Sequence, residues 1–255
     1  MTIGFPLGTL YAFLLVLARV SGFIAFLPVP GFRVAPDSVR VALALALSVA
    51  LFPVWPALSN TAPGIGQLVV WALCEAGFGL AAGLAVSLLV EGFQVAAQVT
   101  GLQAGYGYAS TIDPASEADS SVLLVISSLG TGLLFFTSGL DHQLIQVLAA
   151  SLERFPAGSW APASASLDGL IRLGGTMFST GLRLALPVAA VLMLIDLALA
   201  LVGRVQQQLQ LLSLAFPGKM AATLAILITL APVVPLLFSS VSERTLAMLW
   251  HVLGS

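Results

Sequence analysis

About six apolar segments, most of them close to 20 residues long, run through this chain of 255 residues. A helix needs roughly 20 apolar residues to cross the hydrocarbon core of a bilayer. Lipid offers no partner for the amides of an open strand, and strict apolar–polar alternation is absent, which argues against a membrane β-barrel. The sequence therefore predicts an all-α membrane protein with segments at Leu7–Leu27, Val41–Leu58, Leu68–Val90, Val122–Leu140, Gly181–Val202 and Met220–Val241.

The charge content supports the same class. Charged residues make up 8% of the chain, whereas soluble proteins carry roughly 25%. The net charge of −2 provides no basic surface for nucleic acid. No positive charge precedes the first apolar segment, so we expect that segment to stay in the membrane instead of being cleaved as a signal peptide. The single cysteine, Cys74, excludes an internal disulfide and a cysteine metal cluster.

Prolines mark the ends of several segments, because proline removes a backbone donor and disfavours helix before it. Two pairs predict corners between helices, and Pro187 falls early in the fifth segment, where a first-turn position or a kink is expected. The stretch Asp141–Arg172 is the most polar, and we interpret it as the main extramembrane connection between four segments and two. The two corner pairs are Pro28 with Pro30, and Pro53 with Pro56.

The basic residues do not sort to one side of the predicted membrane. Alternation through six spans gives one side Arg33, Arg40, Arg204 and Lys219, and the other Arg154, Arg172, Arg183 and Arg244. A simple bundle of spans carries a clear excess on the cytoplasmic side. Either the predicted spans are wrong or the chain is not a simple six-span bundle.

The charged residues Arg19, Glu75 and Asp196 lie inside apolar segments. A charge at mid-membrane costs about 2.5–3.5 kcal/mol on insertion scales, so such groups usually face protein or water and form pairs. We hypothesise that Arg19 pairs with Glu75 or with Asp196. Two roles remain open at this point, a proton or ion relay and a structural ion pair or snorkelling side chain.

Small residues recur four apart at Gly79 with Gly83 and at Gly101 with Gly105. This spacing lets two helix backbones approach closely, so we assign these glycines to helix packing.

A polar face follows the third apolar segment. Glu91, Gln94 and Gln98 are three and four residues apart and share one helix face. The helix from Leu68 is therefore expected to continue past the lipid and become amphipathic, with a face that lines water, meets a partner or is simply solvated.

A loop of unusual composition is predicted at about 101–121. It holds three acidic residues and no basic one, together with Tyr106 and Tyr108. Gly105 loosens the backbone, and Asp113–Pro114 begins a turn. A loop at membrane depth is tolerated only where it lines a cavity or is buried in protein.

No enzyme constellation, metal set or cofactor motif is found. The two histidines, His142 and His251, are far apart, and neither has a metal-binding context. The sequence contains no phosphate-binding loop and no serine nucleophile motif. We predict a protein that is not an enzyme and needs no cofactor.

Four stretches, in order along the chain, carry a resemblance to a known family. Gly101-Leu-Gln-Ala-Gly105, followed by Ala109-Ser-Thr-Ile-Asp-Pro-Ala-Ser116, is similar to the signature loop of the FliR family of flagellar type III protein export. The other three are similar to its first hairpin, its fifth segment and the turn into its last segment. The sequence departs from the family at Gln206–Gln208, where Ala-Pro-Gln is common, and at Ala215, where glycine is usual. The three stretches are Arg19 with Pro28, Pro30, Pro36 and Arg40; Leu184–Val188 with Asp196–Arg204; and Phe216-Pro217 with Lys219.

The resemblance implies helical hairpins in an export-gate cone, with a FliP-like part at residues 1–180 and a FliQ-like hairpin at 181–255. It implies a place in the bacterial inner membrane at the flagellar basal body, with FliP-like, FliQ-like, FlhB-like and FlhA-like partners and unfolded exported proteins as cargo. Asp196 and Arg204 join Arg19 and Glu75 as buried or packing charges. The loop is implied to plug the pore through Gly105, Tyr106, Tyr108, Ile112, Asp113 and Pro114.

Two other functions remain open. A virulence-type secretion system uses a related gate subunit, and neighbouring genes would separate it from the flagellar one. A small secondary transporter would use Arg19, Glu75 and Asp196 as its site, although we find no internal repeat of the kind that many transporters show.

Overall fold

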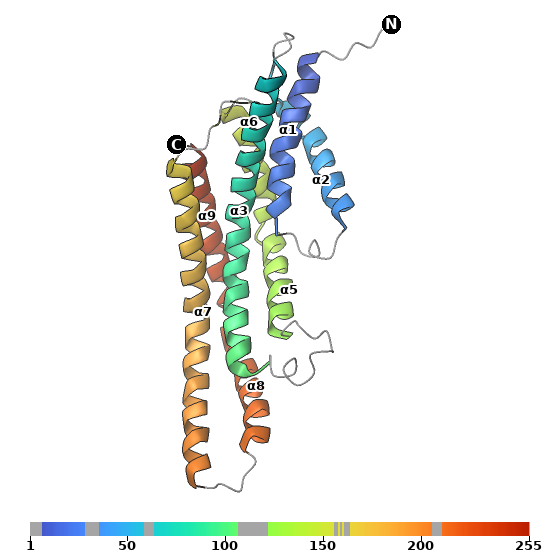
Figure 1. Ribbon diagram of the computed structural model, residues 1–255. Coiled ribbons are helices and arrows are strands. Elements are labelled where there is room, and N and C mark those ends of the chain that lie inside the picture. Colours follow the sequence, from blue (N-terminus) through green and yellow to red (C-terminus); the bar gives the residue numbers. More distant parts are fainter. Residues whose placement is uncertain are drawn as a thin grey trace. The chain divides into compact units, whose positions relative to one another are not determined.

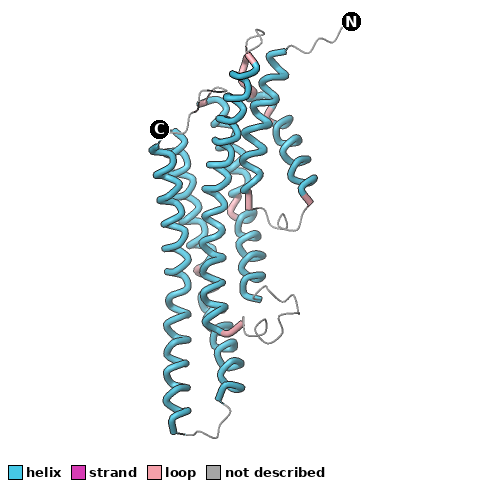
Figure 2. The backbone as a smooth tube through the Cα atoms, viewed as in Figure 1, coloured by secondary structure: helices cyan, strands magenta, loops and turns pink. Residues whose placement is uncertain are grey.

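The computed structural model describes residues 7–28, 36–58, 64–106, 122–155, 158, 160, 164–205 and 211–254, and within these ranges it consists of helices and short turns with no strand (Figures 1 and 2). This confirms the predicted all-α fold class. The elements are α1 (Leu7–Phe26), α2 (Asp37–Ala50), the short 3-10 helix η1 (Phe52–Val54), α3 (Ile65–Ala104), α5 (Val122–Thr137), α6 (Leu140–Arg154), α7 (Ser164–Val205), α8 (Leu211–Leu230) and α9 (Val234–Gly254).

Three of the described helices are long and apolar enough to cross a membrane: α1, α3 and the part of α7 at Asp168–Arg204. Two sharply bent pairs, α5 with α6 and α8 with α9, raise the number to five if each pair counts as one span. The number is lower than the six segments predicted, because α2 has only 14 residues and two of the other segments are broken.

Helices α3 and α7 are much longer than a bilayer is thick. They contain 40 and 42 residues, which at about 1.5 Å per residue gives roughly 60 Å, twice the hydrocarbon core of about 30 Å. The prediction that the helix from Leu68 continues past the lipid is confirmed, because α3 ends only at Ala104. Pro187 lies in the interior of α7 and not in its first turn, because the helix already begins at Ser164.

The stretch Asp141–Arg172, interpreted as the main extramembrane connection, is mostly helical, because α6 and the beginning of α7 occupy most of it. Charged residues such as Glu153 and Arg154 made it appear loop-like, but they lie on the exposed side of α6. The apolar residues recur at helical spacing and form one buried face. That face consists of Leu140, Leu144, Val147, Leu148, Ser151 and Leu152.

The chain forms two compact units that are interleaved along the sequence. Unit 1 comprises Met1–Leu88, Phe135–Leu173 and Ser242–Ser255, and unit 2 comprises Leu89–Leu134 and Gly174–Val241. Helix α7 continues without interruption across the predicted boundary at 180/181. The division into FliP-like and FliQ-like parts concerns resemblance and stays a prediction.

In unit 1, α1 and α3 lie against each other at very short backbone separation. A Cβ atom at Gly79 would collide with the carbonyl oxygen of Arg19, and one at Gly83 would collide with that of Phe23. From the other helix, a Cβ at Gly22 would lie 2.5 Å from the carbonyl oxygen of Ala76. Only glycine allows this contact, which is the small-residue packing known from membrane helices.

In unit 2, the C-terminal part of α3 is surrounded by other helices. The rings of Phe93 in α3 and Phe238 in α9 are 5.4 Å apart, and the Ser127 hydroxyl of α5 donates to the Phe93 carbonyl oxygen at 3.3 Å. A buried cluster joins α3 to α7, with partly buried residues of α8 packed against it. The cluster consists of Ala104, Val188 and Leu192, covered by Tyr106, Ile195, Ile226 and Leu230.

Candidate functional sites: a buried ion pair and the end of helix α3

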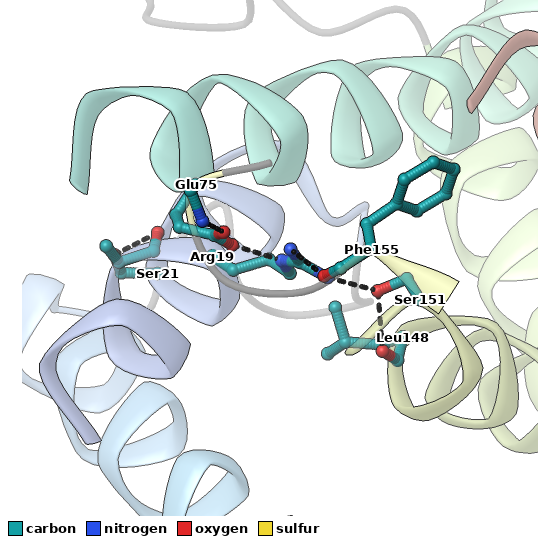
Figure 3. Close-up of polar contacts among 8 residues, drawn as sticks. Arg19, Ser21, Glu75, Leu148, Ser151 and Phe155 are labelled. Atoms are coloured by element: carbon teal, nitrogen blue, oxygen red, sulfur yellow. Dashed lines mark hydrogen bonds and ion pairs between the residues drawn. The ribbon is translucent and has the colours of Figure 1, made fainter. Parts of the chain in front are cut away.

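An ion pair lies at the centre of unit 1. Arg19 of α1 donates from Nε to Oε2 of Glu75 on α3 (Figure 3). The two side chains are 0% and 1% exposed, so neither charge reaches solvent within the chain. Of the two partners considered for Arg19, the structure gives Glu75.

Three further hydrogen bonds satisfy the pair. The Arg19 guanidinium donates to the Ser151 hydroxyl of α6 at 3.1 Å and to the Phe155 carbonyl oxygen at 3.2 Å, as Figure 3 shows. The backbone amide of Gly158 donates to Oε1 of Glu75 at 2.9 Å. The ion pair therefore joins α1 and α3 to α6 and to the chain that follows it.

Aromatic rings enclose this cluster. The Arg19 guanidinium carbon lies 4.6 Å from the centre of the Phe78 ring, in cation–π geometry. The Trp160 ring meets Phe78 edge-on at 5.6 Å. Gly158 has a positive φ of 77°, and the Trp71 ring occupies the position that a Cβ would take there.

The hydrogen bonds of Arg19 and Glu75 favour a structural role over a proton relay. A relay group needs a route for protons and a second protonation state of accessible energy. Here each charged nitrogen and oxygen of the pair is already bonded to protein, and removing one partner would leave a buried charge uncompensated. This arrangement is suited to holding helices together.

Asp196 forms a different ion pair, within unit 2. Lys219 of α8 donates from Nζ to both carboxylate oxygens of Asp196 on α7, at 2.8 and 2.9 Å. The Asp196 side chain is 45% exposed, and Arg204 is exposed in the last turn of α7. The sequence placed both residues among the buried or packing charges. Within this chain they are at the surface, because α7 presents that side to its surroundings.

Helix α3 ends at Gly105 in a specific hydrogen-bonded cap. Gly105 has a positive φ of 86°, which strains residues with a side chain. Its amide donates to the Leu102 carbonyl at 3.1 Å, and the Tyr106 amide donates to the Gly101 carbonyl at 3.0 Å. These two bonds form a Schellman motif, which satisfies the last carbonyls of the helix and turns the chain away from its axis. Gly101 thus acts in the cap as a buried acceptor.

Helix α8 contacts this cap. The Phe216 ring covers Gly105, where a Cβ would lie 2.6 Å from a ring carbon. The Tyr106 hydroxyl donates to the Met220 carbonyl oxygen at 3.4 Å. Burial raises the pKa of the Tyr106 phenol, so it remains a neutral donor.

The remaining predicted loop residues, Tyr108, Ile112, Asp113 and Pro114, lie outside the described residues. On the polar face of α3, Gln94 is buried and donates to the Thr131 hydroxyl at 3.5 Å, while Gln98 is exposed. Among the residues described, no group of His, Cys, Asp and Glu could hold a metal ion.

Sequence reasoning missed Ser151, Gly158, Phe216 and Met220 as members of these clusters. The first two lie in the stretch interpreted as a connection, where only the helical spacing of Ser151 with Leu148 could have indicated a buried position. The contacts of Phe216 and Met220 depend on how α8 packs against the end of α3, which no local sequence pattern predicts.

The chain contains long apolar helices, two of them linked by a buried ion pair and one ending in a glycine cap. These features define an integral membrane protein with several helices. A family model described as "Bacterial export proteins, family 1" matches residues 10–245. The chain belongs to this family, which confirms the resemblance predicted from its motifs.

The curated relatives cover most of the chain. The flagellar biosynthetic protein FliR of Escherichia coli K12 is 30% identical over 86% of this chain and 83% of its own length. FliR of Bacillus subtilis is 26% identical over 95% of both chains. The surface presentation of antigens protein SpaR of Salmonella typhimurium is 26% identical over 86% of this chain and 82% of its own.

Proposed function

We propose that this chain is the FliR-type subunit of the flagellar type III export gate in the bacterial inner membrane. In this proposal it forms the export channel with FliP-like and FliQ-like subunits and passes unfolded flagellar proteins, next to FlhB-like and FlhA-like components. The observation that carries the proposal is the family match over residues 10–245, together with flagellar relatives that align over most of the chain.

The unburied surface of α7 supports a place in a multi-chain assembly. Large apolar side chains of α7 are exposed from Ile171 to Val202, a stretch of roughly 45 Å at about 1.5 Å per residue. A bilayer of about 30 Å covers roughly half of a helix of 60 Å. Apolar surface beyond the lipid has to be covered by protein, which agrees with partner subunits around this helix.

The plug proposed for the pore begins where α3 ends. The Gly105 cap directs the chain out of the helix at Tyr106, and the proposed plug continues through Tyr108, Ile112, Asp113 and Pro114. Apolar and aromatic groups at a narrow constriction exclude ions by dewetting, yet they yield to a passing chain.

We assign Arg19 and Glu75 a structural role in this subunit.

The decisive experiment has two parts in the native host. An affinity-tagged chain is expected to co-purify with FliP-like and FliQ-like proteins, and deletion of the gene is expected to abolish secretion of hook and filament subunits. Deletion of Tyr106–Asp113 is expected to leave the complex assembled but to leak ions and slow growth. Normal ion retention in the assembled deletion variant would contradict the plug.

The similarity to SpaR makes a virulence-type gate the second candidate. The flagellar relatives favour the first, and the secretion assay separates the two by the proteins whose export is lost. A solute transporter that uses Arg19 and Glu75 is disfavoured because the pair is enclosed and each of its charged nitrogens and oxygens is hydrogen-bonded to protein.

A further inference from the structure

We propose that α8 positions the chain that leaves α3, through a joint made by Gly105, Tyr106, Phe216 and Met220. This proposal rests on the proposed gate function and adds to it two positioning residues outside the loop, Phe216 and Met220 of α8. The joint is defined by two contacts already described: the Phe216 ring over Gly105 and the Tyr106 hydroxyl on the Met220 carbonyl.

The first contact fixes the helix end. Because the missing Cβ of Gly105 leaves room for the Phe216 ring, this side chain of α8 reaches the backbone of the cap. A ring seated there opposes any rotation of the Gly105 backbone, since rotation would carry backbone atoms into the ring. The direction in which the chain leaves α3 is thus set jointly by the Schellman cap and by α8.

The second contact fixes the residue after the cap. Tyr106 packs against the cluster of Ala104, Val188 and Leu192, and its hydroxyl reaches the backbone of α8. Phe216 and Met220 are four residues apart and face the same side of α8. One face of α8 therefore holds two consecutive residues at the end of α3.

Helix α8 is itself held against α7. Lys219 lies on the turn between the two joint residues, and its ammonium binds Asp196 through both oxygens. Ile226 and Leu230 of α8 pack on the same cluster as Tyr106. Displacement of α8 along α7 would therefore move the first residue of the loop, so the joint links the C-terminal helices to the proposed plug.

The test uses chromosomal variants in the native host, with ion retention, assembly and secretion measured on each. Phe216→Ala removes the ring from Gly105, and Tyr106→Phe removes only the phenol donor. Phe178→Ala, at an exposed phenylalanine of α7, and Tyr11→Phe in α1 are the matched controls.

We expect Phe216→Ala to raise ion leakage about 5–30-fold in an assembled complex, since a loss of one or two kcal/mol changes a population by that factor. Tyr106→Phe is expected to raise it about fivefold, because one hydrogen bond contributes about 1 kcal/mol. Phe216→Leu keeps an apolar group over Gly105 and is expected to restore most of the ion retention in an assembled complex.

The outcomes separate the joint from the gate. If deletion of Tyr106–Asp113 leaks ions while Phe216→Ala and Tyr106→Phe retain them, the joint is refuted and the gate function stands. If the deletion itself retains ions in an assembled complex, the plug and the joint both fail. If Phe216→Ala does not assemble, Tyr106→Phe decides alone, and wild-type leakage in that variant refutes the joint.

Discussion

The buried pair of Arg19 and Glu75 makes the stability of the chain sensitive to a single charge. Arg19→Met leaves Glu75 with one amide donor, from Gly158, and no cation, at a position 1% exposed. Removal of one partner from a buried pair costs about 3–5 kcal/mol. For a chain of this size each kcal/mol moves the melting midpoint by about 2–4 °C, so we expect a loss of roughly 6–20 °C.

The double variant is the sharper half of this test. Glu75→Gln combined with Arg19→Met removes both charges and keeps an acceptor for the Gly158 amide. Neutral replacement of a buried pair is often nearly neutral in stability, so the double variant is expected to recover much of the loss. Arg154→Met, at an exposed arginine at the end of α6, is the matched control, with an expected change within about 0.5 kcal/mol.

Cys74 provides the assay. It is the only cysteine of the chain, it is partly buried, and it precedes Glu75 on α3. A thiol-reactive fluorophore therefore reports the opening of this region when the purified chain is heated. The reasoning is refuted if Arg19→Met melts with the wild type, or if the double variant is no more stable than Arg19→Met.

Two further predictions concern the helix contacts. Gly83→Ala places a methyl group against the α1 backbone and is expected to lower the yield of folded protein, measured by size-exclusion chromatography. Gly66→Ala is the control, because a Cβ there would have no atom within 4 Å. Equal yields of the two variants would contradict the close approach of α1 and α3. Gln94→Leu removes a buried carbonyl oxygen that has no hydrogen-bond partner among the described residues, together with a long bond of 3.5 Å to Thr131. Thermal stability should therefore be unchanged or raised by up to about 1 kcal/mol, and a clear loss would contradict this prediction.

The sequence was sufficient for the fold class and for the charged residues that matter, but not for their partners. The position of Arg19 inside an apolar segment predicts an ion-pair partner, because an unpaired charge there has a high free-energy cost. Both Glu75 and Asp196 met that requirement. The choice between them depends on which helices pack together, and that follows from the close approach of α1 to α3 at Gly79 and Gly83.

Helix boundaries were predicted least well where composition and periodicity disagreed. Helix α6 was missed because its exposed face carries Glu153 and Arg154, although its apolar residues keep helical spacing. Helix α7 was predicted to begin near Gly181, but it extends back to Ser164. Pro187 lies inside that long helix. Proline lacks a backbone N–H, so one hydrogen bond of the helix is lost there, while the turns on both sides keep theirs.

The distance along the chain between Arg19 and its partners has a consequence for biosynthesis. Glu75 follows Arg19 by 56 residues, and Ser151 follows it by 132. Because the ribosome makes the chain from its N-terminus, α1 reaches the membrane while its cation is still alone, at a cost of about 2.5–3.5 kcal/mol on insertion scales. That cost is offset only when α3 arrives, and the hydrogen bonds from α6 come later still. Helix α1 thus remains a provisional span until a third of the protein has been synthesised, which makes the order of translation part of how this subunit is built.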